Sequence, residues 1–286
     1  MDWFESWEII VAAAVVVVAL YLFAIHIATA AHPFIDRAMF RDRNFVVGMV
    51  VITMLGAQWL SFLALVSPYL QTLAGYPVVT AGVAMVPQAL ANGVGALVAG
   101  RLLLRTGPIP LMVLGVLCLS LANWGMALLT PDFDHVTIAA IVAVHGAGLG
   151  LLFVPLTIIT FSTLPSGYTD VGTGFYALGR NLGSSIGASV AVAWLVRKTQ
   201  ANHAVLSENV SHFNETLRHM SLPEVWTLGD VAGLAALDAV TTRQAAILAY
   251  VSDFGWLAIT MVAVLPLFLL IRMPARKEAA VGAVAS

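Results

Sequence analysis

Arg180 and Asn181 stand inside a long apolar segment, beside glycines spaced four residues apart. A charged side chain at membrane depth is costly unless it meets water or a partner, so an arginine there needs a binding or packing role. Gly179, Gly183 and Gly187 form two overlapping GxxxG steps, which let another helix backbone approach closely. The segment predicts a helix that packs on its glycine face while Arg180 faces a cavity or a neighbouring helix.

Further polar side chains fall inside apolar segments: His26, Gln58, Gln88, Asn92, Asn123 and His145. Hydrogen bonds between helices are the simpler explanation for the amides. For His145 two interpretations stay open, because the glycine-rich stretch 146–150 follows it. It either bonds to another helix or, as a titratable group beside flexible backbone, responds to protons or substrate.

Enzyme motifs are missing from the sequence, which has no HExxH, Walker loop, GxSxG or paired cysteines. No acid falls in the middle of a predicted span, and Cys118 is the only cysteine. An intramembrane enzyme built on His26, His32 or His145 would therefore lack an acidic or thiol partner at depth. We expect no enzyme, no cofactor and no catalytic residue.

One polar stretch could hold a metal. Carboxylates and imidazoles would share one helical face there, although a solvated amphipathic face is the simpler interpretation. These residues are Glu208, His212, Glu215 and His219. We predict no metal site.

The elements that must position the polar residues are membrane spans. The chain is 60% hydrophobic and 10% charged, with a mean hydropathy of +0.93, far outside the range of water-soluble domains. About 20 apolar residues cross a bilayer as a helix. Seven such runs occur, at residues 9–27, 45–67, 78–100, 109–129, 136–161, 171–196 and 250–271. The sequence predicts an all-α integral membrane protein with seven transmembrane helices.

Basic residues predict the orientation of these spans, since short cytoplasmic loops are enriched in Lys and Arg. Three clusters fall on one side: Arg37, Arg41 and Arg43; Arg101 and Arg105; Arg272, Arg276 and Lys277. The predicted N-terminus is outside and the C-terminus cytoplasmic. Residues 197–249 are expected to form a long outer loop, with a short helix over 234–249 leading into the last span.

Short motifs in register with the predicted spans give the chain a family resemblance. They are Asp2–Ser6, Phe40–Phe45, Pro68–Gln71 with Gly75-Tyr76 and Ala81-Gly82, Gly148–Leu156, Gly179–Gly187, and Arg243–Ala245 with Ala249-Tyr250. Together they resemble the fourteen-span drug:proton antiporters of the major facilitator superfamily, of the EmrB/QacA type. Residues 100–107 resemble the superfamily's GxLxDRxG loop, with Leu104 at the aspartate position, so a charge-relay role of this loop is doubtful.

The resemblance implies that residues 1–44 hold an extra transmembrane helix and a basic cytoplasmic loop. Residues 45–286 then form the C-terminal six-helix half-bundle. In such transporters substrate binds near the midplane between two halves. The cavity candidates implied by analogy are Gln58, Gln88, Asn92, His145 and Arg180, with Gly179, Gly183 and Gly187 as packing residues. The family's proton-coupling acids belong mainly to the N-terminal half.

The function implied is that of the C-terminal portion of a proton-coupled multidrug efflux transporter in the inner membrane. It would export amphipathic or lipophilic drug-like compounds and be inactive without its N-terminal half. The resemblance also implies contact with the lipid bilayer, protons, and a periplasmic adaptor and outer-membrane channel, but no nucleic acid. An alternative is a self-standing N-outside seven-span receptor or sensor. A retinal Schiff base is excluded, since Lys198 and Lys277 lie outside the last predicted span.

Overall fold

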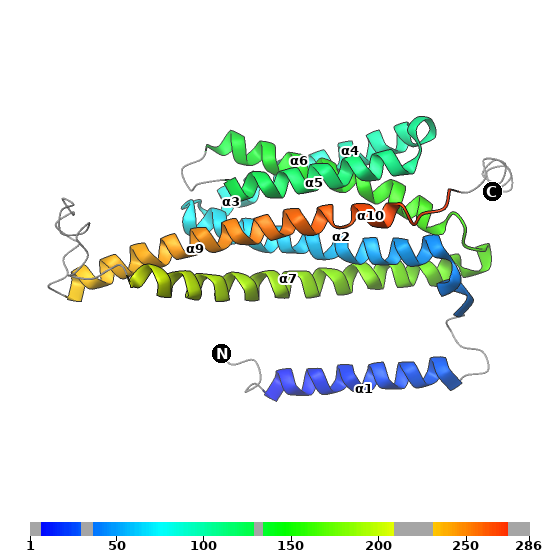
Figure 1. Cartoon of the computed structure of the whole chain (residues 1–286), viewed down its shortest axis with the longest axis horizontal. Helices are drawn as coiled ribbons and strands as arrows, with labels where there is room; N and C mark the ends of the chain where they lie inside the picture. Colours follow the sequence, from blue (N-terminus) through cyan, green and yellow to red (C-terminus); the bar gives the residue numbers. More distant parts are fainter. Residues whose placement is uncertain (1–6, 30–36, 129–133, 209–230, 274–286) are drawn as a thin grey trace.

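The computed structural model describes residues 7–29, 37–128, 134–208 and 231–273, and their regular structure is entirely helical (Figure 1). The helices are α1 (Trp7–Thr29), α2 (Arg43–Pro68), α3 (Val78–Ala84), α4 (Val86–Thr106), α5 (Pro108–Leu128), α6 (His135–Phe161), α7 (Thr169–Ser207), α9 (Val231–Val262) and α10 (Leu265–Phe268). Short 3-10 helices cover Arg37–Arg41 and Ser166–Tyr168, and a π-helical turn covers Tyr69–Leu73. The all-α prediction is confirmed for these residues.

Five stretches of the described residues are long and apolar enough to cross a membrane. They are Arg43–Leu73, Val78–Thr106, Pro108–Leu128, His135–Phe161 and Val231–Phe268. The other two predicted spans lie in α1 and α7. In α1 the apolar helical stretch, Ile10–Ala19, is shorter than a full membrane span. Helix α7 is long enough, but its glycines, serines, Arg180 and Asn181 lower its hydropathy.

Three of the membrane spans depart from regular α-helical structure at or next to a proline. Proline lacks the N–H of a helical hydrogen bond and crowds the preceding turn. Pro68 leads into the π-helical turn, Pro87 follows the break at Met85 between α3 and α4, and Pro266 follows the break between α9 and α10. Pro155 remains inside α6. Such irregularities are tolerated in membrane helices because neighbours satisfy the freed backbone groups.

The helices of the bundle run up and down side by side, while α1 is set apart from them (Figure 1). Helix α6 packs against α2, α4 and α5, and α7 packs against α2 and α9. The two largest of four buried hydrophobic clusters among the described residues fill most of the interior. One includes Ile52, Met112, Leu152 and Leu156; the other includes Phe62, Leu65, Tyr250 and Phe254.

Side-chain hydrogen bonds fix several helix ends. Asp42 and Asp134 accept hydrogen bonds from the backbone N–H of Phe45 (2.8 Å) and Thr137 (3.1 Å) at the starts of α2 and α6. The buried Asn44 amide donates to the carbonyl oxygen of Arg272 and accepts from its N–H, both at 2.8 Å. The start of α2 is thereby joined to the segment after α10.

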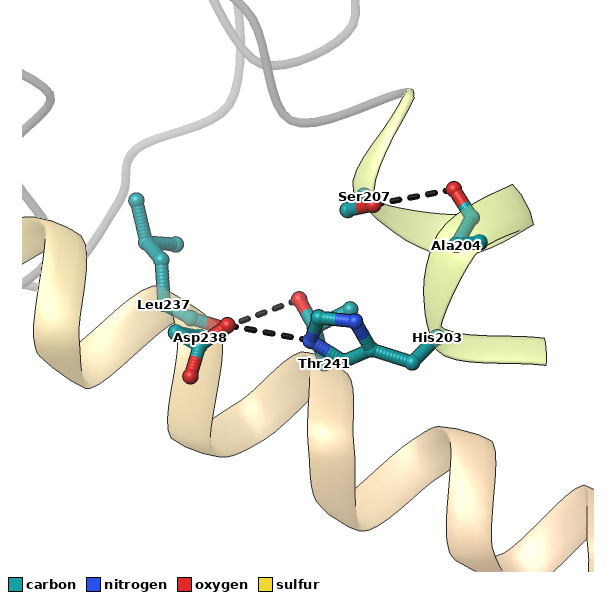
Figure 2. A network of polar contacts seen from close by, with 6 residues as sticks. All are labelled: His203, Ala204, Ser207, Leu237, Asp238 and Thr241. Atoms are coloured by element: carbon teal, nitrogen blue, oxygen red, sulfur yellow. Dashed lines mark hydrogen bonds and ion pairs between the residues drawn. The ribbon is translucent and has the colours of Figure 1, made fainter. Parts of the chain in front are cut away.

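The outer loop expected over 197–249 is largely helical in the described part. Helix α7 continues to Ser207 and α9 begins at Val231, so the helix expected over 234–249 is the first half of α9. The two extensions meet where His203 Nε2 lies 3.0 Å from Asp238 Oδ1 (Figure 2). Asn202 also donates to the carbonyl oxygen of Ala245 at 3.2 Å. His212, Glu215 and His219 lie outside the described residues.

Candidate substrate site

The glycine face of α7 meets α2. A Cβ built at Gly183 would clash with the Thr53 carbonyl oxygen, and one at Gly187 would lie 2.5 Å from the Ala57 Cα. From the other side, a Cβ at Gly56 would clash with the Arg180 carbonyl oxygen. The two backbones approach so closely that no side chain fits between them at these positions.

Arg180 and Asn92 share a hollow of about 200 Å³ between α2, α4, α6 and α7. Its other lining residues are Leu55, Gly56, Trp59, Leu149 and Phe153. Asn92 is exposed and Arg180 half-buried, so both present polar atoms at an accessible surface. Ser184, one turn after Arg180, is buried and donates to the Arg180 carbonyl oxygen at 2.9 Å. The close α2–α7 contact therefore holds the backbone of Arg180 while its side chain reaches the hollow.

Gln88 and His145 form a different kind of site, a buried pair between α4 and α6. The Gln88 Nε2 amide donates to His145 Nδ1 at 3.0 Å, so the neutral ring carries its proton on Nε2. The ring is fully buried and stacks on Phe62, with centroids 3.6 Å apart. Nε2 has no hydrogen-bond partner among the described residues. His145 is an interior residue here and does not line the Arg180 hollow.

The glycines after His145 lie where α6 closely contacts its neighbouring helices. A Cβ at Gly146 would clash with Gln88 on α4, and one at Gly148 would lie 2.9 Å from the Gly115 carbonyl oxygen on α5. Gly150 faces Asn92 on α4 in the same way. All three lie inside α6. Close contacts with two neighbouring helices therefore account for these glycines, and a response of His145 to protons or substrate stays a prediction.

Gln58 lies on another side of α2, at a pocket of about 450 Å³ between α2, α7 and α9. The pocket also contains Asp253, which is only 4% exposed. The statement that no acid sits in the middle of a span is wrong for this residue. The span was expected to begin at Tyr250, which put Asp253 at its edge, whereas the apolar helical stretch runs over Val231–Phe268.

A sequence signal for Asp253 does exist. Tyr250, Phe254 and Met261 are buried at helical spacing on α9, and Asp253 falls within the same run. Polar residues earlier in α9, such as Thr242 and Arg243, hide the length of the helix from a hydropathy scan. Thus the structure divides the five cavity candidates into three places: Asn92 with Arg180, Gln88 with His145, and Gln58 with Asp253.

Helices that span a membrane and hold polar side chains in hollows between them define a multi-pass membrane protein. The model of the Major Facilitator Superfamily matches residues 5–188, and the chain belongs to this superfamily. The predicted family resemblance is thereby confirmed.

Curated relatives are transport and resistance proteins. The chain is 27% identical over 221 residues to the multidrug export protein EmrB of Escherichia coli strain K12, covering 77% of this chain and 43% of that protein. It is 24% identical over 278 residues to the fatty acid resistance protein FarB of Neisseria gonorrhoeae, covering 96% and 54%. It is 29% identical over 177 residues to the tetracenomycin C resistance and export protein of Streptomyces glaucescens, covering 62% and 33%. The chain thus spans about half or less of the length of these relatives.

Proposed function

We propose that this chain is the C-terminal portion of a proton-coupled multidrug efflux transporter of the inner membrane. Its cargo is an amphipathic or lipophilic compound, and the hollow with Asn92 and Arg180 is one wall of the central cavity. A second half-bundle supplies the opposite wall, because superfamily transporters bind substrate between two halves. By the same resemblance, a periplasmic adaptor and an outer-membrane channel are proposed partners.

The outward face of α7 is the observation that carries this proposal. Asn181, Ser185 and Ser189 follow one another at one-turn intervals and are all exposed. Facing lipid, such a polar row beside Arg180 would be costly. Exposed Leu182 and Ile186 adjoin it, which suits contact with protein. This face is therefore suited to a second half-bundle and to the aqueous cavity between the halves.

The neighbouring segment α3–α4 supports the same partner. Only 17% of its 18 most apolar consecutive residues are buried, against 50% of the corresponding residues in the spans of α2, α5 and α6. Leu90, Val94 and Leu97 are among its exposed side chains. A half-bundle docked on α4 and α7 would cover these residues and close the hollow between them.

Complementation tests the proposal. The chain is co-expressed with the N-terminal half of the Escherichia coli EmrB protein, and efflux of a lipophilic dye is followed in inverted vesicles with and without a proton gradient. We expect gradient-dependent efflux only when both halves are present. Proton-driven efflux from liposomes that hold this chain alone would overturn the requirement for a second half.

Arg180→Ala then tests the cavity wall. Because its backbone, and not its side chain, makes the close α2–α7 contact, we expect copurification of the two halves to persist. Efflux should fall at least about tenfold, since a charge at membrane depth is lost from the cavity. Arg197→Ala, exposed on the same helix, is the matched control and should retain efflux. If Arg180→Ala instead abolished copurification, the arginine would be a structural residue.

A further inference from the structure

Basic side chains gather at one end of the bundle, where α2 begins and α4 and α10 end (Figure 1). All of them are exposed, and none forms an ion pair within 4.0 Å among the described residues. The described acids at this end are Asp42, which accepts from the Phe45 N–H and the Thr163 hydroxyl, and Asp170 in the first turn of α7. Positive charge therefore exceeds negative charge here. The basic residues are Arg41, Arg43, Arg101, Arg105 and Arg272.

Contacts bring together three of the elements that carry these arginines. The buried Asn44 amide, at the start of α2, donates to the carbonyl oxygen of Arg272 and accepts from its N–H, both at 2.8 Å. Gly107, two residues after Arg105, lies against the segment after α10, since a Cβ built there would be 3.6 Å from the Met273 Cε. The start of α2, the end of α4 and the segment after α10 thus meet at one place.

Strongly exposed apolar side chains stand next to these arginines. Leu104 is 92% exposed and directly precedes Arg105, and Leu269 is 85% exposed three residues before Arg272. Leu104 stands at the aspartate position of the loop that residues 100–107 resemble, so this chain has an apolar side chain there and no negative charge. Arginine beside exposed leucine matches a phospholipid, which combines a phosphate with apolar acyl chains.

We propose that this end of the bundle binds the headgroup of an anionic phospholipid through Arg43, Arg105 and Arg272. The acyl chains lie against Leu104 and Leu269, and the bound lipid joins α4 to α2 and to the segment after α10. A guanidinium group suits this role because it donates two parallel hydrogen bonds to phosphate oxygens. The inference goes beyond the proposed export role and does not depend on it.

Two simpler roles account for single arginines but not for their arrangement. Arg105 lies in the last turn of α4, where a cation stabilises the negative end of the helix dipole. Basic residues also mark the cytoplasmic side of membrane proteins in general. Neither role requires arginines from three elements to adjoin one another, nor exposed leucines beside them. Neither predicts a preference for one class of lipid.

The experiment titrates the purified full chain in detergent with phospholipids and counts bound lipids by native mass spectrometry. The probes are cardiolipin, phosphatidylglycerol and phosphatidylcholine with the same acyl chains. We expect cardiolipin to bind at least about tenfold tighter than phosphatidylcholine, because its two phosphates can engage arginines of more than one element. Phosphatidylglycerol, with one phosphate, should lie between them.

The double variant Arg105→Gln with Arg272→Gln tests the arginines. Both side chains are exposed, and the pairing with Asn44 uses the backbone of Arg272, so we expect the variant to fold. Its affinity for cardiolipin should fall to within about threefold of that for phosphatidylcholine. Replacing the same two arginines with lysine should keep most of the preference. Cardiolipin should also raise the melting temperature of the wild type more than that of the glutamine variant.

Arg197→Gln with Lys198→Gln is the matched control, because it removes the same charge at the opposite end of the bundle. It should keep the preference for cardiolipin. Leu104→Asp should weaken cardiolipin binding more than Leu104→Asn does, since only the aspartate repels phosphate. Inorganic pyrophosphate, which has phosphates but no acyl chains, should not displace cardiolipin at equal concentration.

An unchanged preference for cardiolipin in the Arg105→Gln, Arg272→Gln variant would overturn the proposal. An equal loss in the Arg197→Gln, Lys198→Gln control would overturn it too, because the attraction would then come from the overall charge. Displacement by an equal concentration of pyrophosphate would assign the arginines to soluble phosphate compounds and not to a lipid. Binding is measured on this chain alone, so each of these results is independent of whether a second half restores efflux.

Discussion

The charge on the Asp134 carboxylate affects how well the start of α6 is capped. Its carboxylate caps the helix by accepting from Thr137, and this hydrogen bond lowers the pKa of Asp134 below its usual value. The nearby Tyr76 has its pKa raised, first by burial and then by the charge of Asp134. Both residues lie outside the five candidate membrane spans, so ordinary aqueous titration applies to them.

A pH-dependent cap follows from the sign of this shift. A carboxyl whose folded-state pKa is lowered stabilises the protein above its unfolded pKa of about 4, and this stabilisation is lost as the pH falls through the folded value. The melting temperature of the wild type in detergent should therefore exceed that of Asp134→Asn slightly at about pH 7, and the difference should be smaller at about pH 3. Asparagine keeps the cap, so it isolates the charge; a constant difference at both pH values would contradict the argument.

Polar residues at membrane depth were predictable as a set, but their grouping was not. The residue types and apolar surroundings identify Asn92, His145 and Arg180 directly from the sequence. Which of them meet depends on how α4, α6 and α7 are rotated about their axes, and a single sequence with seven apolar runs does not specify this. Asp253 was missed for a local reason, because polar residues in the first half of α9 placed the start of the predicted span at Tyr250.

At the scale of the elements, close packing by small residues governs the bundle. Between helices in lipid, dispersion contacts and short backbone approaches take the place of the hydrophobic effect. The glycine spacing in α7 is visible in the sequence, but its partner is not. The structure places that face against Thr53 and Ala57 of α2. It likewise places Gly146 and Gly150 against α4, and Gly148 against α5.

Two glycines of α7 allow a matched test of this packing. A Cβ at Gly183 would clash with the backbone of Thr53, whereas a Cβ at Gly174 meets nothing within 4 Å. Gly174→Ala should stabilise the helix by up to about 1 kcal/mol, since alanine has the higher helix propensity. Gly183→Ala should destabilise the protein by about 1–3 kcal/mol, because backbone must move, and Gly183→Leu should impair folding more severely.

Thermal unfolding in detergent, with the yield of monodisperse protein as a second measure, distinguishes these variants. The two alanine variants should shift the melting temperature in opposite directions. If Gly183→Ala were as stable as Gly174→Ala, α2 and α7 would not be packed as closely as the structure has them.

At the scale of the whole molecule, the bundle has two ends of different charge and a face of mixed polarity. Arg41, Arg43, Arg101, Arg105 and Arg272 lie at the end where α2 begins and α4 and α10 end (Figure 1). Arg197, Lys198 and Arg243 lie toward the opposite end, where α7 ends and α9 begins. With Arg37 of the 3-10 helix Arg37–Arg41 included, the bias among the described residues is six basic residues against three. Because basic residues tend to remain in the cytoplasm, this bias predicts that the end of the bundle with Arg105 is cytoplasmic.

Cysteine labelling in intact cells tests this orientation. Cys118, half-buried in α5, is first replaced by Ala, and a single cysteine is introduced at Thr106 or at Ser207, both exposed and at opposite ends of the bundle. A membrane-impermeant maleimide should label Ser207→Cys from outside, while Thr106→Cys should react only in inverted vesicles. Labelling of Thr106→Cys in intact cells would show that the orientation is the reverse of the predicted one. The Arg180 hollow and the Asp253 pocket would then have the opposite orientation relative to the proton gradient. Because antiport requires the proton to be released toward the cytoplasm, that result would also count against the proposed direction of export.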